Sequence, residues 1–148
     1  METYKQMKDR HQAEVNALPL AFAFSHDRYL ERLAAWNITE EEAKAGAIVG
    51  IGNGGFIRSS DRDLVISTFE RIADERRAAI EADHDGTGYI FQGLKYELIN
   101  HEYSYTGDAA EAVEAVGLTE EDLKREEVQA AIKRAAREVM GAGDPFDE

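Results

Sequence analysis

Apolar residues recur at intervals of three and four along most of the chain, which is the pattern of amphipathic helices. This pattern predicts long helices over residues 3–17, 26–36, 61–82, 89–103 and 126–140, and shorter ones after Thr39, between Asp108 and Gly117, and after Thr119. Two of the starts, Thr39 with Glu42 and Thr119 with Asp122, have the spacing of a capping box, in which the two side chains bond backbone N–H groups.

Three short segments depart from the helical pattern and predict strands. Leu20–Phe24 follows Pro19 and alternates, which places both of its phenylalanines on one face. Residues 47–51 and 56–58 flank Gly52-Asn53-Gly54-Gly55, a typical hairpin turn. We therefore expect an α+β protein: a mostly helical single domain over residues 1–140, with a small antiparallel sheet of about three strands. Residues 141–148 are expected to form a flexible acidic tail.

Composition excludes several classes of protein. The chain has no cysteine, so it has neither disulfides, nor a thiolate nucleophile, nor a zinc site with cysteine ligands. No apolar run approaches the roughly 18–20 residues of a membrane span. The first fifteen residues are polar and of mixed charge, unlike a signal peptide. These observations predict a cytoplasmic protein that does not bind membranes.

The net charge of −13 argues against direct binding to nucleic acid, which requires a basic surface. The charge is uneven, since residues 97–148 contain 14 acids and 5 bases. One interpretation is a well-solvated surface. The other is an acidic face that binds a basic partner protein. The residues of that candidate face are Glu111, Glu114, Glu120, Glu121, Asp122, Glu126 and Glu127.

The segment from residue 83 to residue 94 resembles a calcium-binding loop. Asp83, Asp85 and Thr87 occupy the first, third and fifth positions of an EF-hand loop, and Gly88 occupies the sixth. The twelfth position is Leu94, where the motif requires a bidentate glutamate. The alternative is an ordinary turn between two helices, rich in aspartate and glycine.

Residues 50–55 match the pattern G-x-G-x-x-G that dinucleotide-binding folds use to approach phosphate groups. In those folds a helix follows the glycines, whereas here a strand is predicted. A tight hairpin is therefore the preferred interpretation.

Glu97 and His101 are four residues apart and share a face of the predicted helix. That face could hold a divalent metal or an acid–base pair. A metal would need a further ligand, for which the candidates are Asp108, His11, His26 and His84. The alternative is structural, with His101 hydrogen-bonded to a carboxylate. Because the chain carries no nucleophile or phosphate-binding motif, enzymatic activity is not predicted. A metal- or small-molecule-binding domain, such as a hydrolase, is the competing hypothesis.

Three stretches of the chain resemble an uncharacterised family of short acidic proteins carried by phages and mobile elements of gut bacteria. They are HQAEVNALPLAFAFS (11–25), GNGGFIRSSD (52–61) and YELINHEYSYTGDAAEAVEAVGLT (96–119). The resemblance implies no particular activity. It implies an accessory protein that binds a protein of its host or element, and one version of this hypothesis is an inhibitor of a nucleic-acid-binding host defence protein.

Overall fold

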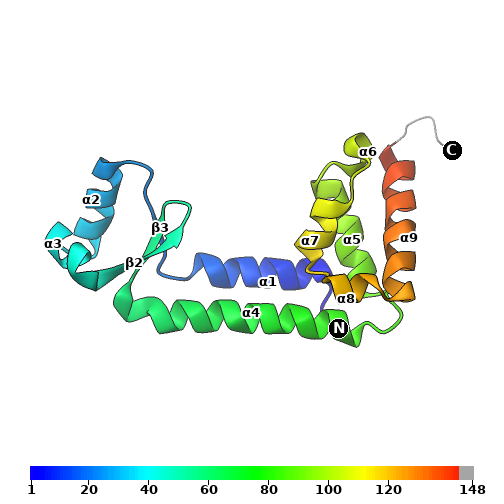
Figure 1. Cartoon of the computed structure of the whole chain (residues 1–148), viewed down its shortest axis with the longest axis horizontal. Helices are drawn as coiled ribbons and strands as arrows, with labels where there is room; N and C mark the ends of the chain where they lie inside the picture. The colour runs from blue at the N-terminus through cyan, green and yellow to red at the C-terminus, as the bar shows by residue number, and fades with distance from the viewer. Residues whose placement is uncertain (144–148) are drawn as a thin grey trace. The chain divides into compact units, whose positions relative to one another are not determined.

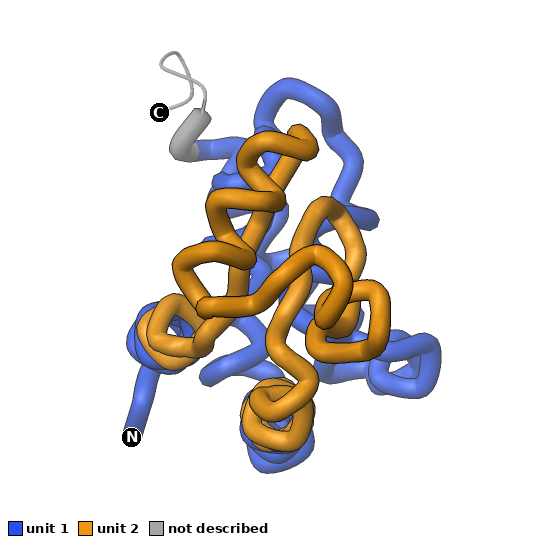
Figure 2. Tube along the Cα trace, turned by 90° about the vertical axis from the view of Figure 1, so that its left-hand side faces the viewer, with its two compact units in different colours: residues 1–12, 72–148 blue, residues 13–71 orange. Residues whose placement is uncertain are grey.

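The computed structural model describes residues 1–143 and confirms the α+β class. Helices account for most of the described chain, and one small antiparallel sheet has the strand order β1-β3-β2 (Figure 1). The chain divides into two compact units, which Figure 2 colours separately. Unit 1 contains residues 1–12 and 72–148, and unit 2 contains residues 13–71. The boundary falls within helix α1 (Tyr4–Asn16) and helix α4 (Arg62–Ala82).

The sheet of unit 2 is built around the predicted hairpin. Strands β2 (Ile48–Gly52) and β3 (Gly55–Arg58) are joined by Asn53 and Gly54, whose φ angles of 53° and 78° are those of a type I′ turn. This confirms that the glycine-rich segment is a hairpin. The register shifts between Gly50 and Gly52, so Ile51 forms a bulge on the outer strand. Strand β1 (Ala21–Phe22) pairs with the other edge of β3.

The face of strand β1 that carries its phenylalanines is exposed, and the opposite face is buried. Ala21 is buried, whereas Phe22 and Phe24 are 45% and 85% exposed. A period of two shows which side chains share a face but does not show which face is covered. The strand is also shorter than predicted, since only two of its five residues pair.

Short helices complete the core of unit 2. Helix α2 (His26–Ala35) starts at its predicted cap, Ser25, and α3 (Glu40–Glu42) starts with the predicted capping box. The turn η1 (Ala43–Ala47), whose Gly46 has a φ of 106°, follows, and the short 3₁₀ turn η2 (Ser59–Asp61) precedes α4. The buried core consists of Ala21, Leu33, Ala43 and Phe56, with Tyr29 and Trp36 packed edge-on to Phe56.

Helix α5 (Tyr89–Asn100) is the centre of unit 1. Its residues Ile90, Leu94 and Leu98 are completely buried, and the helix packs against α7 (Ala110–Val116) and α9 (Glu126–Gly143). The short helices α6 (Tyr103–Thr106) and α8 (Glu120–Leu123) connect these elements. Helix α9 continues beyond its predicted end at residue 140, so the predicted tail does not begin at residue 141. The rest of that tail, residues 144–148, lies outside the described residues.

Two glycines allow close packing in unit 1. A Cβ atom on Gly93 of α5 would lie 2.8 Å from the ring of Tyr4, so glycine lets α1 approach α5. Gly86, which is buried in the loop before α5, has a φ of +73°, and a Cβ atom there would lie 2.8 Å from the backbone oxygen of Glu127. The loop therefore rests directly on the first turn of α9.

We predict that Gly86→Ala destabilises the protein more than Gly107→Ala does. Both glycines have a left-handed φ, which costs an alanine roughly 1 kcal/mol in either place. A Cβ atom at Gly107 meets open space, whereas one at Gly86 meets rigid backbone. The extra loss at Gly86 should be about 1–3 kcal/mol in urea unfolding followed by circular dichroism. Equal losses would show that the contact with α9 is not tight.

Candidate functional site

The acidic surface lies in unit 1, along the segment from the end of α5 to the first turn of α9. From Glu97 to Glu127 the sequence contains ten acids and two bases. Eight of these acids are exposed to solvent. They are Glu102, Asp108, Glu111, Glu114, Glu120, Glu121, Glu126 and Glu127. Six of the seven residues predicted for the acidic face are therefore accessible.

Asp122 is the exception. Its side chain is buried and accepts two hydrogen bonds, of 2.8 and 2.7 Å, from the Arg77 guanidinium. It also completes the predicted capping box with Thr119. The bonds from Arg77 and Thr119 hold the pKa of Asp122 down at about 2. Asp122 thus joins α8 to α4 and is not part of the exposed face.

Four of the exposed acids also have a local role. Glu120 and Glu121 lie in the first turn of α8, and Glu126 and Glu127 lie in the first turn of α9. Carboxylates are stabilising there because they face the positive end of the helix dipole. The two bases of the segment are held locally as well: Lys124 pairs with Glu121, and Arg125 donates to the backbone oxygens of Asp83 and His84.

Glu97 is a buried carboxylate at the centre of unit 1. One of its oxygens accepts a hydrogen bond of 2.9 Å from the Tyr4 hydroxyl and pairs with the Lys8 ammonium, and both partners come from α1. Burial, with the neighbouring Glu97, raises the pKa of Tyr4, so this tyrosine stays protonated and donates. The Lys8 ammonium also lies 5.2 Å from the centre of the Tyr96 ring.

His101 links Glu97 to the acidic surface. Its Nε2 atom lies 3.3 Å from the other Glu97 oxygen, and its Nδ1 atom lies 3.2 Å from Glu111. Asp108 instead accepts a hydrogen bond from the backbone of Ala110, at the start of α7. Within the described residues, Glu97, His101 and Asp108 do not bring three ligand atoms close enough to share one metal ion. The geometry therefore favours the structural interpretation of this cluster over the metal site.

The loop from residue 83 to residue 88 uses its candidate calcium ligands for turn geometry. The Asp83 carboxylate accepts hydrogen bonds from the backbone N–H groups of Gly88 and Ile90, which lie at the start of α5. Asp85 accepts from both the backbone and the hydroxyl of Thr87, and these bonds lower the pKa of Asp85. This arrangement is that of a hydrogen-bonded helix–helix turn.

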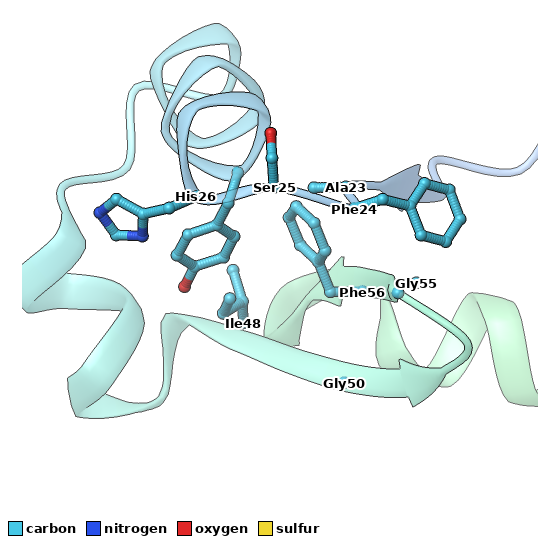
Figure 3. Close-up of a pocket in the computed structure, with 10 residues that line it drawn as sticks. Ala23, Phe24, Ser25, His26, Ile48, Gly50, Gly55 and Phe56 are labelled. Atoms are coloured by element: carbon cyan, nitrogen blue, oxygen red, sulfur yellow. The ribbon is translucent and has the colours of Figure 1, made fainter.

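Unit 2 contains a pocket that the sequence did not predict. The open pocket, of about 610 Å³, lies between the start of α2 and the hairpin. Figure 3 shows Phe56 between the helix and the strands, with His26 and Phe24 pointing to opposite sides. Residues 15–25 and 45–57, which supply most of the pocket lining, contain no charged residue. This absence of charge is the feature of the sequence that could have indicated the pocket.

Comparison with known proteins identifies a family. A model of a family of unknown function, DUF7659, matches residues 3–138. The chain belongs to this family. The match covers all of unit 2 and most of unit 1, and it confirms an uncharacterised family, while phage or gut origin stays a prediction. No curated protein and no solved structure matches the chain. Within residues 1–143, no helix has both the length and the apolar character needed to cross a membrane.

We predict that Lys8→Met destabilises this DUF7659 protein by about 1–3 kcal/mol, because it removes from the buried Glu97 carboxylate a partly exposed cationic partner. Lys5→Met is the matched control on the same helix. It removes a pair with Asp9 in which both side chains are more than 60% exposed, and such pairs contribute at most about 1 kcal/mol. Urea unfolding measures the loss of stability in each of the two variants.

Adding Glu97→Gln to Lys8→Met should recover part of the lost stability, because the amide can still accept from Tyr4 and carries no charge. If Lys8→Met lowered the free energy of unfolding no more than Lys5→Met, the buried carboxylate would not depend on Lys8.

The Arg77–Asp122 pair predicts a loss of stability in acid. The folded-state pKa of about 2 lies below the ordinary 3.8, so the contribution is complete above about pH 4 and disappears as the pH falls towards 2. Its size is about 2 kcal/mol. Asp122→Asn should lower stability at pH 7 and flatten the decline between pH 5 and pH 2, as measured by urea unfolding at each pH. Parallel pH curves for the two proteins would contradict the assignment.

Proposed function

We propose that this protein is a non-catalytic binding protein whose unit 1 presents its acidic surface to a basic partner protein. The observation that supports the proposal is the set of eight exposed acids between Glu102 and Glu127, in a segment whose two bases are already held by local contacts. The eight exposed acids outnumber the two bases of the segment, and this excess of negative charge produces a potential that attracts and orients a basic surface.

The fold holds this surface in place. Helices α7, α8 and α9 each carry some of the acids, and each packs on the core of unit 1, through Val116, Leu123 and Val128 respectively. Backbone positions are therefore largely set before binding, which reduces the entropic cost of association. A preformed surface of this kind is suited to recognition of a folded basic protein.

The proposal extends to the biological setting. The resemblance to short acidic proteins of phages and mobile elements supports an accessory role in such an element. A rigid array of carboxylates can compete with the phosphates of a nucleic acid for the same arginines and lysines. One version is therefore an inhibitor that occupies the basic site of a nucleic-acid-binding host defence protein.

We predict that a tagged form of the protein captures a basic partner from a host lysate at low salt and releases it as salt rises. The triple charge reversal Glu120→Lys, Glu121→Lys and Glu127→Lys should abolish capture. Quantitative mass spectrometry of the bound proteins measures the effect.

The matched control reverses three acids of unit 2, Asp27→Lys, Glu41→Lys and Asp63→Lys. These residues are also exposed and also lie in the first turn of a helix, so the change in net charge and the loss of helix stabilisation are alike. The control should retain the partner. Capture that survives the unit 1 reversals, or that is lost equally in both variants, would overturn the proposal.

A further inference from the structure

Exposed apolar side chains concentrate in unit 2, whereas most of the net charge belongs to unit 1. The net charge is −10 for the residues of unit 1 and −3 for those of unit 2. Unit 2 nevertheless exposes most of the large apolar side chains found outside the core in the described residues. They are Phe22, Phe24, Leu30, Ile51, Leu64, Ile66 and Phe69.

Three of these side chains gather beside the hairpin turn. A Cβ atom on Gly54 would lie 2.8 Å from the Phe24 ring, and one on Gly55 would lie 2.9 Å from the Phe22 ring and 2.8 Å from Ile51. The glycines thus let both rings rest on the turn. Phe24 remains 85% exposed in this position, so the ring projects into solvent from a rigid support.

The pocket lies directly beside this projecting ring, and Phe24 forms part of its rim (Figure 3). Its walls include the side chains of Tyr29, Ile48 and Phe56, which are largely apolar. Gly50 leaves part of the lining without a side chain, since a Cβ atom there would have no neighbour within 4 Å. An apolar projection and an apolar recess of the same surface therefore lie next to each other.

We propose that the pocket receives Phe24 of a second copy of this chain, in a twofold dimer where each copy fills the pocket of the other. A twofold interface uses one patch on both subunits, so it requires a patch that is complementary to itself. A projecting ring beside an apolar recess meets that requirement. This dimer does not depend on the acidic surface of unit 1.

Electrostatics agree with this occupant. The segments 15–25 and 45–57, which form most of the patch, contain no charged residue, so association there buries little charge. The strongly acidic residues belong to unit 1 and are not part of the patch. Pairing along the free edge of β2 is a poorer alternative, because the bulge at Ile51 interrupts the regular row of backbone groups that an added strand requires.

The patch formed by the exposed phenylalanines and the pocket is small, and its area determines how tightly two copies can associate. A phenylalanine can bury about 150–250 Å². Phe22 and Phe24 are partly exposed, so over two copies they bury at most about 600–1,000 Å². This area lies below about 1,200 Å², in the range of weak and transient complexes. We therefore expect reversible association that depends on concentration.

The experiment is sedimentation equilibrium of the full chain over a wide range of concentration, at low and at high salt. The average mass should rise from the 16.5 kDa of one chain towards twice that value. It should rise at lower protein concentration in high salt, because salt screens the repulsion between two copies of charge −13. Salt therefore favours the dimer, whereas it weakens the complex of the acidic surface with a basic partner. Because the two effects are opposite, the failure of either proposal can be recognised separately.

Two variants test the pocket from its two sides. Phe24→Ser removes the projecting ring and should abolish dimerisation. Gly50→Val fills the recess from within while keeping Phe24, and it should abolish dimerisation with an unchanged or higher melting temperature, since the added side chain meets open space in a strand. Leu64→Ser is the control: it removes another exposed apolar side chain, which does not line the pocket.

The proposal is overturned if the unsubstituted protein is monomeric at every concentration, or if Gly50→Val dimerises normally. Loss of the dimer in Leu64→Ser to the same extent as in Phe24→Ser would also overturn it, because association would then be general apolar adhesion. The unit 1 charge reversals should leave dimerisation intact.

Discussion

Unit 1 depends on one buried carboxylate, that of Glu97. A buried charge is tolerated only when partners replace the lost solvation, and Glu97 obtains them from Tyr4 and Lys8 on α1 and from His101 at the end of its own helix. The close approach of Tyr4 to Gly93 brings the first of these partners into place. The first turns of the chain are therefore bound into the core of its second half.

Charge and apolar surface are separated between the two units. The structure gives unit 1 the exposed carboxylates and unit 2 the exposed phenylalanines and the pocket. The two surfaces suit different interactions, since one is weakened by salt and the other is strengthened by it.

Local features were predictable from the sequence, and long-range contacts were not. The capping boxes at Thr39 and Thr119 and the turn at Asn53 depend only on neighbouring residues, and all three are confirmed. The partners of Glu97 and Asp122 are not neighbours: Tyr4 lies 93 residues from Glu97, and Arg77 lies 45 residues from Asp122. Periodicity places such residues on a helix face but cannot say which other helix meets that face.

The order of the two units along the chain has a consequence for synthesis on the ribosome. Unit 2 is one continuous segment, whereas unit 1 joins residues 1–12 to residues that begin at position 72. Unit 2 can fold while the chain is still growing, but the first helix has to wait for α5 to emerge before Tyr4 and Lys8 meet Glu97. Until then the Tyr4 ring, which belongs to the core of unit 1, stays uncovered.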